Sequence, residues 1–201
     1  MPAQTQPIVA RQAATCAVFC VVAVCLTLLL HPSPPPFQAW RVGLPWLQQV
    51  AFALAFALFA AVSFFAFKWL GSRRQTLAAP ASVGGFDLSG NKPIWIGLYA
   101  GVGEELLFRA ALQPLLGMGW SSGLFALAHV RTATLAGRLR NRALYLGNVF
   151  VVSLGLALLY THVGLLAAIL AHASIDIGAL YAIRSVSSSR LRPSRRNPRI
   201  S

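Results

Sequence analysis

The sequence predicts an all-α fold: a polytopic transmembrane helical bundle of about six spans, with a polar site near the bilayer midplane. Hydrophobic residues make up 57% of the 201 residues and charged residues 10%. A soluble domain of this composition would leave too much apolar surface in water. The net charge of +13 comes from Arg and Lys in short stretches between apolar runs, not on one face of a soluble fold. We therefore expect a lipid bilayer as the partner, and no nucleic acid.

The N-terminal part, residues 1–92, is expected to hold two transmembrane helices and a cytoplasmic linker. The first span covers about residues 13–30 and stops at a proline-rich segment that no helix continues through. The second covers about residues 47–70, with Trp46 and Trp69 as interfacial anchors. A polar linker that contains Gly, Ala, Ser and Pro follows at residues 71–92.

Residues 93–183 are expected to form a helical core, followed by a basic, disordered tail at 184–201. The first core helix begins after Pro93, which suits a first helical turn. A Gly-Met-Gly segment breaks the pattern at 117–119, and the next helix is short. It ends near residue 130 or continues toward 135. The predicted spans of this core are 94–116, 121–130, 143–160 and 163–183.

Basic residues orient these spans. With six spans, all but two of the 17 Lys and Arg residues lie on one side of the membrane; Arg41 lies on the other side and Arg109 within the bilayer. The positive-inside rule then places both termini in the cytoplasm.

Three charged residues lie inside the predicted span 94–116: Glu104, Glu105 and Arg109. The whole chain has four acidic residues, and a third, Asp176, lies in another apolar run. A charge at the centre of a membrane helix costs roughly 2.5 to 3.5 kcal/mol, so such groups usually face a protein interior or a water-filled cavity and serve a function.

Depth estimates bring three polar side chains together. At about 1.5 Å per residue, Glu104 lies roughly 15 Å from the cytoplasmic side. His129 and His172 lie roughly 12 to 14 Å from the opposite side. In a hydrocarbon core about 30 Å thick, all three reach a similar depth near the midplane.

Spacing within each helix suggests separate roles. Glu105 and Arg109 are an i,i+4 pair in the favourable order, and they form either a structural ion pair or a direct part of the chemistry. Glu104 lies about 100° around the helix, has no local partner and is the candidate base. Two further i,i+4 pairs share a helix face: Phe125 with His129, and His172 with Asp176.

At these residues the sequence resembles the CPBP family of intramembrane proteases, which includes the CAAX prenyl endopeptidase and bacterial Abi-type proteins. Three motifs carry the resemblance in order over about residues 94–183: EExxxR at 104–109, FxxxH at 125–129 and HxxxN/D at 172–176. Each motif alone is weak, whereas all three in order on three apolar helices are fairly specific.

The resemblance implies a glutamic-type protease that needs no metal cofactor. Glu104 would act with His129 to activate water, and His172 with Asp176 would stabilise the oxyanion. Glu105, Arg109 and Phe125 would support the site. A carboxylate base and hydrogen-bond donors near a developing oxyanion suit amide hydrolysis.

Asp176 departs from the pattern, because the prenyl-protease branch prefers asparagine there. An ionised aspartate would repel an oxyanion, so Asp176 must be protonated, must orient His172, or must bind a metal. Zinc is a less favoured alternative, with His129, His172, Asp176 and Glu104 as ligands.

We therefore expect an intramembrane endopeptidase of the bacterial plasma membrane. Its substrate would be a membrane-anchored or lipidated protein, such as one with a C-terminal sorting signal, or a peptide precursor. The alternative is a non-catalytic membrane binding or immunity protein, or a small transporter, that uses the same polar cluster. A transporter would be expected to show internal repeats, and none is convincing.

Overall fold

The computed structural model describes residues 8–30, 43–70, 87–130 and 139–190. Within these ranges the regular elements are helices, and no strand is present. They are α1 (Ile8–Leu30), α3 (Trp46–Leu70), α4 (Lys92–Glu105), η1 (Leu106–Leu112), α5 (Gln113–Ala128), α7 (Leu139–His162) and α8 (Leu165–Arg190). The predicted all-α class is thus confirmed for the described part of the chain.

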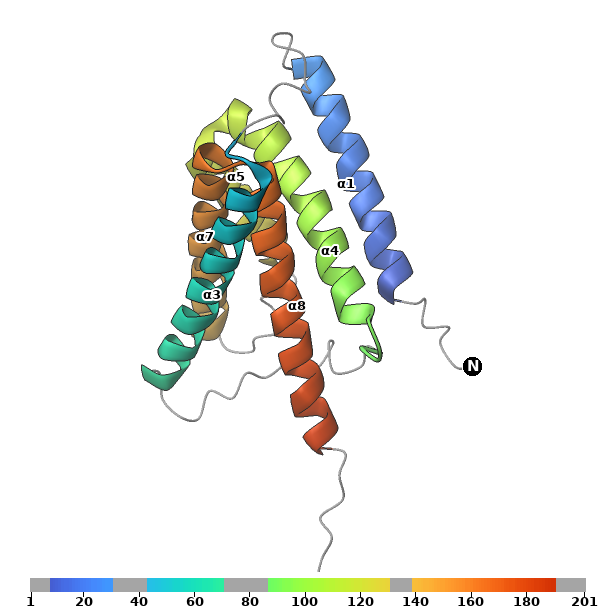
Figure 1. The fold of residues 1–201 in the computed structure, drawn as a ribbon, viewed down its shortest axis with the longest axis vertical. Helices are drawn as coiled ribbons and strands as arrows, with labels where there is room; N and C mark the ends of the chain where they lie inside the picture. Colours follow the sequence, from blue (N-terminus) through green and yellow to red (C-terminus); the bar gives the residue numbers. More distant parts are fainter. Residues whose placement is uncertain (1–7, 31–42, 71–86, 131–138, 191–201) are drawn as a thin grey trace, which may run out of the picture.

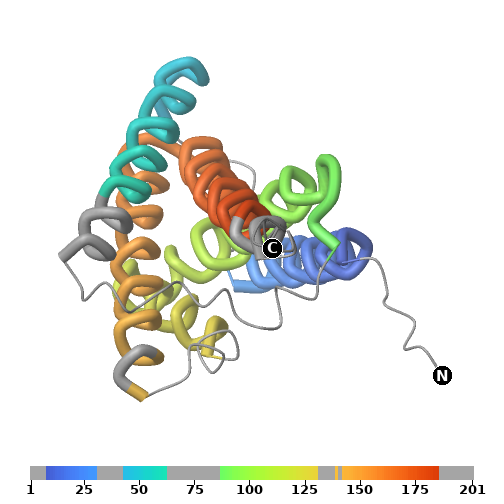
Figure 2. The backbone as a smooth tube through the Cα atoms, turned by 90° about the horizontal axis from the view of Figure 1, so that it is seen from below, coloured from blue at the N-terminus to red at the C-terminus, as the bar shows by residue number. Residues whose placement is uncertain are grey.

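Helix α8 lies between two pairs of helices (Figures 1 and 2). It packs against α4 on one side and against α3 and α7 on the other. Helix α1 packs against α4 and η1, and α5 packs against η1 and α7. The helices that carry the three sequence motifs are therefore neighbours around one interior region.

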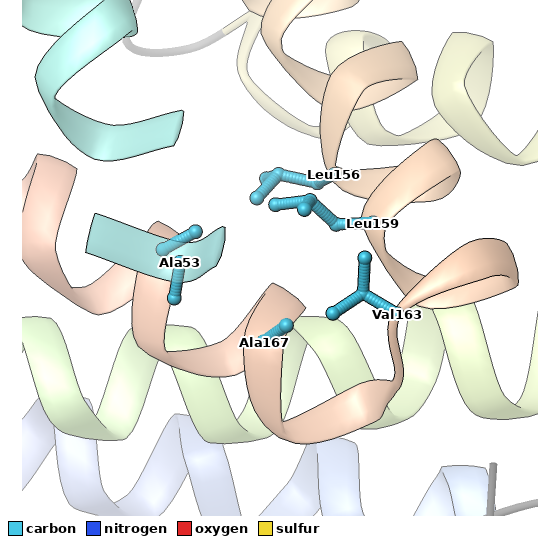
Figure 3. Packing of buried hydrophobic residues seen from close by; sticks show 6 residues of the cluster. Ala53, Leu156, Leu159, Val163 and Ala167 are labelled. Carbon is cyan, nitrogen blue, oxygen red and sulfur yellow. The ribbon is translucent and has the colours of Figure 1, made fainter. Parts of the chain in front are cut away.

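Small side chains allow close approach where α3, α7 and α8 meet (Figure 3). Ala53 of α3 and Ala167 of α8 are fully buried, and they pack beside Leu156, Leu159 and Val163. Because lipid tails are as apolar as leucine, helices in a bilayer associate by tight packing, for which small residues are favourable. This cluster fixes α8 against α3 and α7.

A nearly continuous helical segment carries the acidic motif, because α4, η1 and α5 follow one another without a loop. Element η1 is a π-helix of seven residues, a geometry often found at functional sites. Helix α5 then bends at Gly117, whose φ of 79° and ψ of 165° suit glycine. Ser121 Oγ donates a hydrogen bond to the carbonyl oxygen of Phe108 (2.6 Å), so the chain after the bend returns alongside η1.

The start of α4 is tied to the last part of α8. Asp87 forms an ion pair with Lys92 and accepts a hydrogen bond from the backbone N–H of Ser89. Hydrogen bonds from Lys92 and Ser89 hold the pKa of Asp87 well below its usual value. Arg184 donates to the carbonyl oxygen of Gly90 (3.1 Å), so α4 begins at the end of the bundle where α8 finishes.

The prediction of six spans is not confirmed. Among the described residues, three segments are long and apolar enough to cross a membrane: Ile8–Leu30, Arg142–His162 and Leu165–Ser185. Trp46–Val62 is a shorter apolar helix. The predicted span 94–116 is helical, but its three charged residues lower its apolar character. The predicted span 121–130 ends at Ala128, too short at 1.5 Å per residue to cross about 30 Å.

The sequence predicts that the disordered tail begins at residue 184. This boundary is too early, because α8 continues through Arg184 to Arg190. The residues after 190, most of the predicted linker at 71–86 and the suggested continuation of the fourth helix toward 135 lie outside the described residues.

Replacement of Gly101 by alanine is expected to destabilise the bundle by about 1–3 kcal/mol, the usual cost of overpacking. A Cβ at Gly101 would lie 2.8 Å from the carbonyl oxygen of Ile169 and 3.1 Å from the backbone nitrogen of Ala173. Both contacts are to the backbone of α8, which has little room to move. Thermal unfolding of the purified protein in detergent measures the effect.

Gly147→Ala is the matched control, because a Cβ there would meet nothing within 4 Å. Alanine is favoured over glycine inside a helix by roughly 0.5–1 kcal/mol, so this variant should be neutral or slightly stabilised. Equal unfolding temperatures for the two variants would show that α4 and α8 are not in close backbone contact.

Candidate active site

Side chains from α4, from α8 and from the residue that follows α5 meet in one cluster. Glu104 Oε2 lies 3.8 Å from His129 Nε2 and 4.0 Å from His172 Nε2. Asp176 Oδ2 lies 3.6 Å from His172 Nε2. The four residues predicted to be catalytic therefore lie in one cluster.

Glu105 and Arg109 form a fully buried ion pair, as their spacing predicts. Arg109 Nε donates to Glu105 Oε2 at 3.0 Å, and both side chains are 0% exposed. Two other nitrogens of the guanidinium face serine hydroxyls: NH2 is 2.6 Å from Ser153 Oγ on α7, and NH1 is 3.5 Å from Ser122 Oγ on α5.

Glu105 has a second partner that spacing could not identify. Its Oε1 accepts a hydrogen bond from Nδ1 of His172 at 2.7 Å, across from α8. Because Oε2 of the same carboxylate pairs with Arg109, Glu105 is ionised and Nδ1 of His172 carries the hydrogen. Glu105 thus joins the arginine to the histidine and is not neutralised by Arg109 alone.

Both histidines present the same ring nitrogen to Glu104. Nδ1 of His129 lies 2.8 Å from the carbonyl oxygen of Phe125, which can only accept, so Nδ1 donates. In each neutral ring the hydrogen is on Nδ1, and Nε2 carries a lone pair that faces Glu104. The hydrogen-bond partner of one nitrogen fixes the role of the other.

Glu104 is the unsatisfied member of the cluster. Its Oε2 is buried and has no hydrogen-bond partner within the described part of the chain. Its distances to the two Nε2 atoms are too long for direct hydrogen bonds. A buried polar atom without a partner is unusual and costly, and such atoms are often associated with function.

Phe125 forms one wall of the cluster. Its ring stacks on His129, with centroids 4.7 Å apart, and meets His172 edge to face at 5.7 Å. The guanidinium carbon of Arg109 lies 5.3 Å from the Phe125 centroid. The predicted aromatic wall therefore contacts both histidines and the arginine.

Exposure increases from the ion pair outward. Glu105 is 0% exposed, Glu104 16%, His129 25% and Asp176 38% by side chain. The cluster is therefore more exposed on the side of Asp176 and His129. The Glu105–Arg109 pair lies behind it.

Sequence reasoning missed three neighbouring residues: Ser122, Ser153 and Tyr145. The two serines hold Arg109, and Tyr145 on α7 lies within electrostatic range of Asp176 and Glu104. Serine and tyrosine in apolar runs carry no motif of their own. The only available signal was their polar character, which does not show which helix face they occupy.

A metal site was the less favoured expectation. Within residues 8–30, 43–70, 87–130 and 139–190, no group of three or more His, Cys, Asp or Glu side chains is arranged to hold a metal ion.

Comparison with known proteins gives one family. Residues 92–178 match the family model "Type II CAAX prenyl endopeptidase Rce1-like". No curated protein and no solved structure matches the chain significantly. The matched segment runs from the start of α4 into α8 and contains all three motifs. Residues 92–178 are thus similar to the Rce1-like CAAX prenyl endopeptidases, the family that the three motifs also resemble.

Proposed function

We propose that the protein is an intramembrane endopeptidase that hydrolyses a peptide bond in a membrane-anchored or lipidated protein. The observation that carries the proposal is the unpartnered Oε2 of Glu104, which faces the Nε2 atoms of His129 and His172 at 3.8 and 4.0 Å. Three protein groups thus converge where a small polar molecule could make the missing hydrogen bonds. The similarity of residues 92–178 to the Rce1-like endopeptidases supports this chemistry.

Glu104 and His129 activate a water molecule in the proposed reaction. The water oxygen attacks the peptide carbonyl carbon, and its proton passes to Glu104, with Nε2 of His129 accepting a second hydrogen bond from the same water. The proton then moves to the leaving amine nitrogen as the C–N bond breaks. Positioned acid and base groups typically accelerate such steps by about 10² to 10⁴-fold.

His172 stabilises the carbonyl oxygen as negative charge develops on it. In its imidazolium form His172 donates from Nε2, while Nδ1 remains hydrogen-bonded to Glu105. Preorganised donors of this kind are often the largest contribution to acyl-transfer catalysis. The buried ion pair with Arg109 keeps Glu105 ionised at this position.

We assign Asp176 a narrower role than the sequence allows. Glu105 already orients His172 through Nδ1, so Asp176 is not needed for that purpose. Its Oδ2 lies 3.6 Å from Nε2 of His172, on the exposed side of the cluster. We assign Asp176 to the substrate side of the cluster, beside the Nε2 atom of His172 that donates to the oxyanion.

The proposed setting is a bacterial plasma membrane, with both termini cytoplasmic. The three apolar spans support an integral membrane protein. We include the helical segment from α4 through η1 as a further crossing, since its charged residues are paired or face the cluster instead of lipid. Sorting signals and peptide precursors are the proposed substrates beside lipidated proteins.

Glu104→Gln is expected to lower cleavage by about 10² to 10⁴-fold, because the amide keeps the size of the side chain and cannot accept the water proton. The assay uses purified protein in detergent with two internally quenched probes, a farnesylated CAAX peptide and a single-span membrane peptide. Asp87→Asn is the matched control, since it makes the same carboxyl-to-amide change in the ion pair at the start of α4. Cleavage by the Gln variant at the wild-type rate would remove Glu104 from the mechanism.

Asp176→Asn is expected to retain activity or increase it by up to about tenfold, because an amide can donate to the oxyanion at any pH. Asp176→Ala provides the comparison and should be less active than the Asn variant. A loss of more than about 100-fold in the Asn variant would instead show that the reaction needs the ionised carboxylate.

Chelation is expected to leave cleavage unchanged, since the proposed base and oxyanion donors are all protein groups. The measurement is the cleavage rate after treatment with 1,10-phenanthroline, followed by added zinc. Inhibition that added zinc reverses would contradict this mechanism. It would support a metal-dependent one with His129, His172 and Asp176 as ligands.

A further inference from the structure

Arg109 is held by residues outside the three sequence motifs. Its NH2 donates to Ser153 Oγ at 2.6 Å, and both side chains are fully buried. Ser153 lies on α7, which carries none of the motif residues. Ser122 on α5 adds a longer contact of 3.5 Å to NH1. The guanidinium therefore has a polar partner on each of its three nitrogens, one of them provided by Glu105.

The same contacts continue to the proposed catalytic histidine. Arg109 Nε binds one oxygen of Glu105 at 3.0 Å, and the other oxygen accepts from Nδ1 of His172 at 2.7 Å. Because the two carboxylate oxygens are divided between these partners, the position of the guanidinium determines where Glu105 meets the imidazole. A hydrogen on Nδ1 leaves Nε2 facing Glu104.

We infer that Ser153, assisted by Ser122, is a positioning residue that fixes Arg109 so that Glu105 holds His172 with its hydrogen on Nδ1. Without the Ser153 hydroxyl, the NH2 group loses its shortest contact and the guanidinium can rotate toward other acceptors. The Glu105–His172 bond then lengthens, and the neutral ring can carry its hydrogen on Nε2 instead. For catalysis, the consequence is a weaker Nδ1 hydrogen bond and a less well oriented imidazolium, and it rests on the proposed function. The consequence for the tautomer of the neutral ring does not.

A purely structural role is the competing explanation. Ser153 could simply join α7 to η1, as buried hydroxyls often do in membrane proteins. Ser121 offers a matched comparison: it is equally buried and also makes a 2.6 Å hydrogen bond, but to the backbone carbonyl of Phe108 instead of Arg109. Loss of either hydroxyl removes one short buried hydrogen bond, and of these two serines Ser153 is the one that contacts the guanidinium.

The test compares Ser153→Ala with Ser121→Ala by ¹⁵N NMR of histidine-labelled protein in detergent, at a pH at which the His172 ring is neutral. A His172→Gln variant assigns the signal. Wild type and Ser121→Ala should show His172 protonated on Nδ1, and Ser153→Ala should show a mixture of tautomers. Unchanged Nδ1 protonation in a folded Ser153→Ala variant would overturn the inference. This readout does not require cleavage, so it decides the inference even if the protein proves not to be a protease.

Kinetics of the same variants give the second readout. Ser153→Ala should lower kcat about tenfold or more with KM unchanged, the loss expected for a hydrogen bond to a charged group. Ser121→Ala should stay within about twofold of wild type. Ser153→Thr, which keeps a hydroxyl, should restore kcat relative to Ser153→Val, which has the same shape without it. Equal kcat in the Thr and Val variants would assign the effect to packing.

Ser122→Ala covers the case in which every change at Ser153 prevents folding. Because its contact with NH1 is longer, the expected loss in kcat is about two- to threefold, with a smaller change of tautomer in the same direction. A folded Ser122→Ala variant with the spectrum and rate of wild type, together with Ser153 variants that do not fold, would favour the structural explanation and count against the inference.

Discussion

The buried ion pair of Glu105 and Arg109 is the interaction on which the site depends. Two charges that are 0% exposed in a membrane protein are unfavourable unless their remaining hydrogen-bonding groups are satisfied. Here the partners come from three other helices: Ser122 on α5, Ser153 on α7 and His172 on α8. The hydrogen-bonding groups of the pair therefore all find partners when α5, α7 and α8 occupy defined positions around α4 and η1.

Glu104 differs from its neighbour in this respect. One residue earlier in the chain, it projects about 100° away and leaves an oxygen buried without a partner. If this part of the chain only held the helices together, an apolar residue at position 104 would give a more stable fold. An unsatisfied buried acceptor such as the Glu104 oxygen costs roughly 1–3 kcal/mol of stability. The contrast between a satisfied acid and an unsatisfied one on the same turn is the strongest physical reason to regard the cluster as a site.

The sequence predicted much of this arrangement, because the charges are few and their spacing is local. The i,i+4 ion pair follows from helix geometry, and the meeting of Glu104, His129 and His172 follows from similar depths in a bilayer. Contacts between helices could not be predicted in the same way. Hydrophobicity shows little about which face of an almost wholly apolar helix points inward, so Ser153 remained hidden. The π-helix at 106–112 has no signal in the hydrophobic pattern, whereas the glycine at 117 marks the bend in α5.

The hydrogen bond between His172 and Glu105 narrows the role of Asp176 in the HxxxN/D motif. The sequence leaves three roles open for Asp176: it could orient His172, bind a metal or donate to an oxyanion. With Nδ1 of His172 held by Glu105, orientation no longer needs Asp176. The more exposed carboxyl group then lies beside Nε2, on the exposed side of the cluster. An aspartate there can act as a hydrogen-bond donor only when protonated, whereas an asparagine would donate at any pH. An asparagine at this position would therefore be the better donor, which is why Asp176 is the one motif residue whose replacement by asparagine is not expected to lower activity.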